Sequence, residues 1–137
     1  VYKRQVQQTF GNPIYAAIAA ATDPIAPGET RTANGMRQCL AQYPQSVVAI
    51  GNAPTALLAL CEQYSEPGEA APAVVIGAPV GFIAVEESKQ ALAQTRLPQI
   101  RVEGRKGGSA ATAAIVNALL RLAHHPPLTS PRQIPGI

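Results

Sequence analysis

Apolar runs and amphipathic stretches alternate along most of the chain. Residues 46–50 and 73–76 form short, nearly uninterrupted apolar runs, which are typical of buried parallel strands. Residues 100–103 alternate between apolar and charged positions, which suits a strand nearer the edge of a sheet. A glycine-bearing loop and then a helical stretch follow each predicted strand, and we expect these helices over 56–64, 86–94 and 110–123.

Two further helices are predicted before the first strand. Residues 14–21 are alanine-rich and helical by propensity. Thr30 suits the N-cap position of a helix over 31–42, in which Met36 and Leu40 share the inner face. Three strand–loop–helix units in succession predict an α/β fold, with helices on both faces of a parallel sheet. Ligands of such sheets bind beyond the carboxyl ends of the strands, where all three glycine-bearing loops are expected.

Composition narrows the class of protein. The 137 residues suffice for one domain, and 47% hydrophobic with 14% charged residues excludes a disordered tail or a charged coiled coil. The first ten residues lack the apolar stretch of a signal peptide, and no apolar run is long enough for a membrane span. A net charge of +3 favours anionic ligands in general. With 4% aromatic residues and no concentrated basic face, nucleic acid is not an expected partner.

The loop over 104–109 has the residues of an anion site. Gly107 and Gly108 let the backbone approach a ligand closely, and Ser109 can cap the following helix. Arg105 and Lys106 add two cations that suit carboxylate or phosphate. The alternative is a tight turn with two solvated charges. The loop matches neither the Walker A pattern nor the dinucleotide pattern, which counts against a generic nucleotide-binding domain.

The other two loops leave alternatives open. Asn52 can bind a ligand through its amide or cap the following helix, in which Pro54 suits the first turn. Thr55 can offer a hydroxyl to a ligand. Phe82 either stacks on a ligand or fills the core, and Arg31 either clamps a carboxylate or is an ordinary surface cation.

The cysteines and histidines of the sequence are best interpreted without a catalytic or metal-binding role. Cys39 and Cys61 are expected on inner helix faces as small buried hydrophobes. His124 and His125 fall in a proline-rich tail, where solvation is favoured over metal binding. No catalytic triad, carboxylate pair or metal-ligand spacing is present, so no metal site is expected.

Four segments together resemble a known family. Residues 48–57 (Val-Ala-Ile-Gly-Asn-Ala-Pro-Thr-Ala-Leu) resemble the hallmark of the precorrin-8X methylmutases, the precorrin isomerases of cobalamin biosynthesis. Residues 75–82, followed by Glu-Glu-Ser-Lys at 86–89, are similar to the second motif of that family. The loop over 104–109, with the helix after it, is similar to the third, and Thr-Arg-Thr-Ala at 30–33 resembles the element that precedes them.

The resemblance implies a flavodoxin-like parallel sheet flanked by helices, and a cytoplasmic homodimer with the site near its interface. It implies migration of a methyl group between neighbouring ring carbons of a corrin precursor, which converts precorrin-8X or its cobalt form to hydrogenobyrinate or cobyrinate. No cofactor is implied, because the migrating group belongs to the substrate. The substrate-binding residues implied are those that match the motifs: Arg31, Thr32, Gly51, Asn52, Ala53, Pro54, Thr55, Gly77, Pro79, Gly81, Phe82, Ser88, Lys89, Arg105, Lys106, Gly107, Gly108 and Ser109.

One feature of the family has no counterpart in this sequence. The family's N-terminal region supplies a histidine thought to protonate the macrocycle, whereas the only histidines here follow the last motif. We therefore expect residues 11–123 to be the C-terminal part of a methylmutase domain that lacks its first strands, with a frayed or unrelated edge at 1–10 and a tail at 124–137. A truncated gene explains this better than a genuine short homologue. The alternative function is a non-catalytic tetrapyrrole-binding module.

Overall fold

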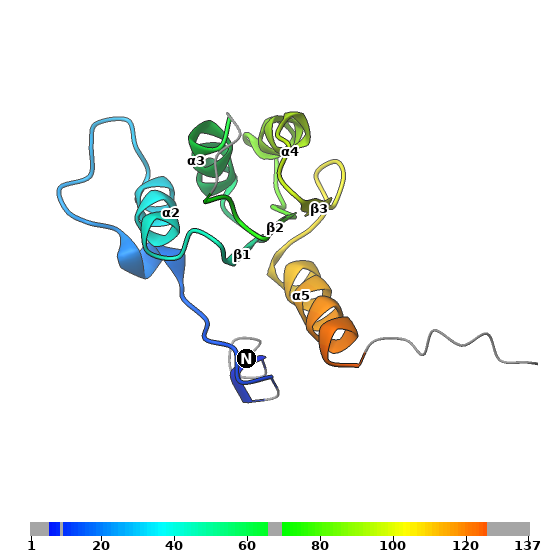
Figure 1. Ribbon diagram of the computed structural model, residues 1–137. Coiled ribbons are helices and arrows are strands. Elements are labelled where there is room, and N and C mark those ends of the chain that lie inside the picture. Colours follow the sequence, from blue (N-terminus) through cyan, green and yellow to red (C-terminus); the bar gives the residue numbers. More distant parts are fainter. Residues whose placement is uncertain (1–5, 9, 66–69, 126–137) are drawn as a thin grey trace, which may run out of the picture.

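A three-stranded parallel sheet forms the centre of the molecule. The computed structural model describes residues 6–8, 10–65 and 70–125 (Figure 1). Strands β1 (Val47–Ile50), β2 (Val74–Gly77) and β3 (Gln99–Arg101) lie in the order β1-β2-β3. The register pairs Ile50 with Gly77 and Gly77 with Arg101, so the carboxyl ends of all three strands meet at one edge. The predicted α/β class with a parallel sheet is confirmed.

Helices cover both faces of this sheet, as predicted. Helices α2 (Arg31–Gln42), α3 (Pro54–Gln63) and α4 (Val85–Gln94) lie side by side on one face, and α5 (Ser109–His124) lies on the other (Figure 1). None of the helices in the described part of the chain is long and apolar enough to cross a membrane.

The hydrophobic core lies between the α2–α4 layer and the sheet. Leu57 and Leu60 of α3 pack there with Val75 of β2 and Leu92 of α4, and all four are fully buried. Met36 and Leu40 of α2 join the same core, which confirms the predicted inner face of that helix. Cys61 is buried there as predicted, whereas Cys39 is only half-buried.

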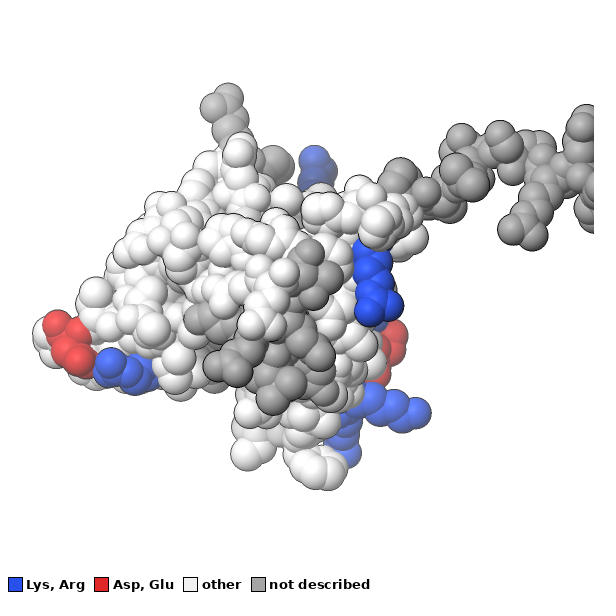
Figure 2. Space-filling model, turned by 90° about the horizontal axis from the view of Figure 1, so that it is seen from below, with Lys and Arg blue, Asp and Glu red and all other residues white. Residues whose placement is uncertain are grey.

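The opposite face of the sheet is much less covered. Thr112 is the only buried residue of α5. Burial alternates along β1, so that Val48 and Ile50 face the core while Val47 and Ala49 are exposed. Seen from below, the described surface is mostly uncharged, and the Lys, Arg, Asp and Glu side chains lie toward its edges (Figure 2).

Three predictions about chain segments need correction or fall partly outside the described residues. The helix predicted over 14–21 is wrong, because only a short 3-10 helix, η1 (Ala17–Ala20), forms and none of its residues is buried. Alanine propensity alone does not sustain an α-helix in so short a segment, and η1 packs against α2 only as a short 3-10 helix. The predicted tail begins too early, since α5 extends to His124. The rest of that tail, 126–137, and residues 1–5 and 9 of the predicted N-terminal edge lie outside the described residues.

Candidate functional site

Three loops meet at the carboxyl edge of the sheet: the first loop (51–53), the second loop (78–84) and the third loop (102–108). The Gly108 N–H donates to the Ala78 carbonyl at 2.8 Å, which joins the third loop to the second. Gly51 of the first loop packs against the start of α5, because a Cβ there would lie 2.9 Å from the Ser109 Cα. The three loops therefore form one continuous surface, as the order of the elements predicted.

The third loop depends on glycine at the turn into α5. Gly107 and Gly108 have φ values of 142° and 107°, and a Cβ on Gly107 would overlap the Ala78 carbonyl oxygen. Gly108 occupies the N-cap position without a side-chain cap, so the predicted capping role of Ser109 is wrong. Ser109 is instead the first residue of α5 and is exposed. Its hydroxyl is available to a ligand rather than committed to the helix.

Three threonine hydroxyls join the N-termini of α2 and α3. Thr55 Oγ1 lies 2.9 Å from the hydroxyl oxygens of both Thr30 and Thr32, which are 3.1 Å apart. Thr30 Oγ1 also accepts a hydrogen bond from the Ala33 N–H, which confirms its predicted N-cap role. The sequence predicts only the N-cap role of Thr30 and not its place beside Thr55. The contact across 25 residues could not be inferred from spacing.

The first loop ends in a helix without a side-chain cap. Pro54 occupies the first turn of α3, as predicted, and Ala53 is the N-cap residue. The capping alternative for Asn52 is therefore wrong. Asn52 is exposed at the carboxyl end of β1, where its amide can both donate to and accept from a ligand.

Both arginines of the predicted site have an acidic partner. Arg31 Nη1 lies 3.0 Å from Asp23 Oδ1, and Arg105 Nε lies 3.2 Å from Glu86 Oε2. All four side chains are about half exposed or more, and such surface pairs contribute about 0–1 kcal/mol. A ligand carboxylate can therefore take the place of either acid at little cost. Neither pairing could be predicted from the sequence, since the partners lie on different elements.

An apolar patch, made of Val80, Phe82 and Ile83, projects from the second loop. Phe82 is 82% exposed and Ile83 is 88% exposed. The alternative in which Phe82 fills the core is therefore wrong. The Arg105 guanidinium carbon lies 5.4 Å from the centre of the Phe82 ring, which is a cation–π contact. The second and third loops thus present an aromatic face beside a cation.

Ser88 and Lys89 of the motif on α4 lie in the interior, whereas Glu86 and Glu87 are exposed. Ser88 is fully buried and its hydroxyl donates to the Val85 carbonyl at 2.8 Å. The Lys89 ammonium donates to the carbonyls of Gly104 and Lys106 at 2.5 and 2.7 Å. Burial lowers the pKa of Lys89, and the carboxylates of Glu103 and Glu86 partly oppose that shift. Gly77 and Pro79 of the second motif are also buried.

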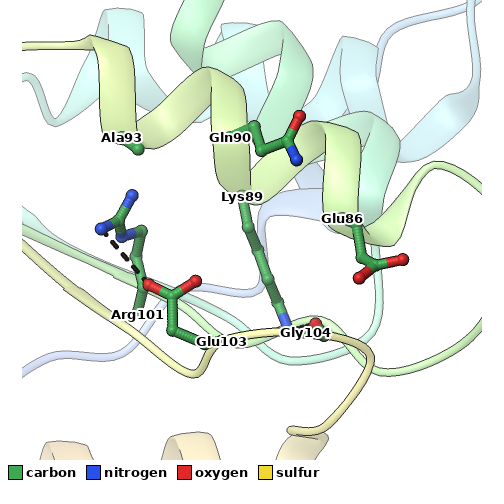
Figure 3. Close-up of a pocket in the computed structure, with 7 residues that line it drawn as sticks. All are labelled: Glu86, Lys89, Gln90, Ala93, Arg101, Glu103 and Gly104. Carbon is green, nitrogen blue, oxygen red and sulfur yellow. Dashed lines mark hydrogen bonds and ion pairs between the residues drawn. The ribbon is translucent and has the colours of Figure 1, made fainter.

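A polar cavity of about 220 Å³ opens between α4 and the start of the third loop. Figure 3 shows the Lys89 side chain directed from α4 toward Gly104, beside the ion pair of Arg101 with Glu103 at 3.3 Å. Charges of both signs line this cavity, so it has no clear preference for an anion. Across the described residues, no three His, Cys, Asp or Glu side chains gather in a group that could hold a metal ion.

Both histidines lie far from the three loops. His124 ends α5 and stacks on Phe10, with ring centroids 5.1 Å apart. Since α5 begins at the loops and rises about 1.5 Å per residue, His124 lies about 22 Å away along the helix. Neither His124 nor His125 is therefore placed to transfer a proton at the loop surface.

The fold and the loops define an α/β protein whose candidate ligand surface lies beyond the carboxyl ends of a parallel sheet. Comparison with known proteins identifies the family. The family model for precorrin-8X methylmutase matches residues 2–122, a range that includes most of the first ten residues. The chain belongs to this family, as the motifs predicted.

Relatives and solved structures agree with this assignment. The chain is 60% identical over 119 residues to a cobalt-precorrin-8 methylmutase of a Synechocystis strain, covering 86% of this chain and 54% of the relative. It is 45% identical over 115 residues to a precorrin-8X methylmutase of a Sinorhizobium species, covering 82% of this chain and 52% of the relative. A solved precorrin-8X methylmutase from Thermus thermophilus has a TM-score of 0.72 at 38% identity, covering 88% of this chain and 59% of that one. The chain spans about half the length of these curated relatives.

Proposed function

We propose that this chain forms the substrate-binding part of an isomerase of cobalamin biosynthesis. The reaction is an intramolecular methyl migration that converts precorrin-8X, or its cobalt form, to hydrogenobyrinate or cobyrinate. The 60% identity to a protein named cobalt-precorrin-8 methylmutase carries this proposal, because it extends over 86% of the chain and includes all three loops. The substrate with cobalt and the one without it are both compatible with these residues.

The chemistry of the loop surface suits such a substrate. A corrin precursor carries acetate and propionate carboxylates around a flat ring. Arg31, Arg105 and Lys106 supply cations for these carboxylates. The exposed side chains of Asn52 and Ser109 supply neutral hydrogen bonds. Phe82 offers an exposed aromatic face to the ring, so the loops can hold the edge of the macrocycle and align the migrating methyl group.

The proton that drives the migration needs a donor other than the two histidines of this chain. Both lie at the far end of α5 from the loops. General acid catalysis typically contributes about 10²–10⁴-fold to a rate. We therefore expect the 137 residues alone to bind the corrin and to isomerise it slowly. A non-catalytic tetrapyrrole-binding module is the second candidate, and this placement of the histidines is the observation that favours it.

A homodimer and a cytoplasmic location complete the proposal. The exposed apolar side chains of Val47 and Leu122, together with the mostly uncharged surface in Figure 2, are suited to contact with a second copy. Light scattering after size exclusion tests the dimer directly, because it gives the mass of the eluting species. A monomer at every concentration tested would contradict this part of the proposal.

Retention of the coloured product tests the binding proposal. The purified chain is mixed with hydrogenobyrinate and passed over a sizing column, and the visible spectrum of the protein peak is recorded. We expect pigment to elute with the wild-type chain and to be lost in the double variant Arg31→Ala, Arg105→Ala, since each lost charged hydrogen bond lowers affinity about tenfold or more. Arg96→Ala, which removes an exposed cation at the far end of α4, is the matched control. A compact but colourless wild-type peak would contradict the proposal.

A further inference from the structure

We propose that Lys89 is a positioning residue, which orders the third loop so that two backbone N–H groups face the carboxylates of the substrate. The inference rests on the proposed function. It gives the buried lysine of the second motif a role different from that of Arg105 and Lys106, whose side chains are exposed. Lys89 acts through the loop and not by contact with the ligand.

Burial and hydrogen bonding separate Lys89 from every other cation described. Its residue is 2% exposed, and it is the only charged residue among those buried in the described part of the chain. The ammonium donates to the Gly104 carbonyl at 2.5 Å and to the Lys106 carbonyl at 2.7 Å. These two carbonyls flank Arg105, so one side chain of α4 holds both ends of the segment that carries the exposed cations. Figure 3 shows the Lys89 side chain reaching toward Gly104.

The geometry of the peptide bond predicts which backbone N–H groups of the third loop point away from Lys89, toward the ligand. In a trans peptide, the carbonyl and the N–H of the next residue point in opposite directions. The carbonyls of Gly104 and Lys106 point at Lys89, so the N–H groups of Arg105 and Gly107 point away from it. Neighbouring backbone N–H groups directed to one side form a cavity that binds anions.

The loop is also held from its other side. The Gly108 N–H donates to the Ala78 carbonyl, and Gly107 packs against the same carbonyl so closely that it leaves no room for a Cβ. The second loop also holds the segment through the Gly81 N–H, which donates to the Arg105 carbonyl at a longer 3.4 Å. Contacts from α4 and from the second loop therefore fix the peptide orientation together. Removal of Lys89 leaves the contacts to the second loop intact and releases the carbonyls of Gly104 and Lys106.

Lys89→Met tests this role, because methionine keeps the length and the apolar stem of the side chain but removes the three donors. Arg96→Met is the matched control, since it also removes one positive charge, at an exposed position two residues after the end of α4. The readouts are amide hydrogen exchange over 104–108, trypsin cleavage after Arg105 and Lys106, and retention of hydrogenobyrinate. The first two need no ligand and report the order of the loop directly.

For Lys89→Met we expect the rates of amide exchange and trypsin cleavage in the third loop to rise about tenfold or more. The affinity for hydrogenobyrinate should fall by a similar factor, because hydrogen bonds to a charged group have free energies of this size. Arg96→Met should leave all three unchanged. Lys89→Arg, which keeps paired donors, should restore part of the protection. If Lys89→Met does not fold, Lys89→Gln takes its place, since its amide can donate to one carbonyl and should give an intermediate exchange rate.

Three results separate this inference from the proposed function. Unchanged exchange and cleavage in a folded Lys89→Met would overturn the positioning role, whatever the ligand. Faster exchange with undiminished pigment retention would overturn the link between the ordered loop and substrate binding. Faster exchange with a colourless wild-type protein would support Lys89 as the anchor of the loop and would refute the proposed ligand instead.

Discussion

Gly107→Ala, compared with a control glycine in the same loop, should distinguish the free energy of packing between the loops from the ordinary cost of replacing a glycine. Its φ of 142° is a conformation that L residues rarely adopt, and holding alanine there costs about 1–3 kcal/mol. The added Cβ would overlap the Ala78 carbonyl oxygen, so the hydrogen bond from the Gly108 N–H must also stretch or break, at about 1 kcal/mol. We expect the free energy of unfolding to fall by about 2–4 kcal/mol in total.

Gly104→Ala provides the matched control within the same loop. Gly104 also has a positive φ, 67°, but a Cβ there would meet no atom within 4 Å. Its expected cost is that of the left-handed conformation alone, about 1–2 kcal/mol. Urea unfolding followed by circular dichroism gives both values, and the sizing-column assay gives pigment retention. Equal destabilisation and equal retention in the two variants would refute the close packing of the second and third loops.

Further predictions concern the core and the thiols. Leu60→Ala should lower the free energy of unfolding by about 2–5 kcal/mol, because Leu60 is fully buried. Ile18→Ala, at an exposed position of η1, should change it by less than about 0.5 kcal/mol, and equal values in urea unfolding would contradict the assignment of Leu60 to the core. Burial raises the pKa of the Cys61 thiol from 9.0 to about 11, so iodoacetamide at pH 8 should alkylate half-buried Cys39 well before Cys61. Above about pH 9 the unfolded chain ionises Cys61 first, so this thiol should make the folded state less stable as the pH rises, which urea unfolding at pH 8 and pH 10 can measure for wild type against Cys61→Ala.

The repeated units were predictable because their signals are local. Apolar runs identify buried strands, and the glycine-bearing loop after each run marks the carboxyl edge. The helix over 31–42 was predicted at its observed bounds because Thr30 caps it. The predicted helix over 14–21 was wrong for the opposite reason: alanine propensity was its only support, and no residue of η1 is buried, although Ala17 packs against the core.

The details of the site depend on contacts between segments far apart in the sequence. Ser109 and Asn52 have residue types that favour helix caps, yet Gly108 and Ala53 occupy those positions because of how the chain leaves each strand. The interior position of Lys89 could not be predicted either, because its hydrogen bonds to the carbonyls of the third loop join residues far apart in the sequence.

The strand order has a consequence for how the protein assembles. Each strand pairs with the strand immediately before it in the chain, so a nascent chain leaving the ribosome meets a neighbour that has already been made. The sheet can therefore grow by one unit at a time along the chain. Both anchors of the third loop, Ala78 and Lys89, are synthesised before the loop itself. Closure of that loop is then the last step of assembly at this edge, and a chain released before residue 108 would have a sheet but no finished ligand surface.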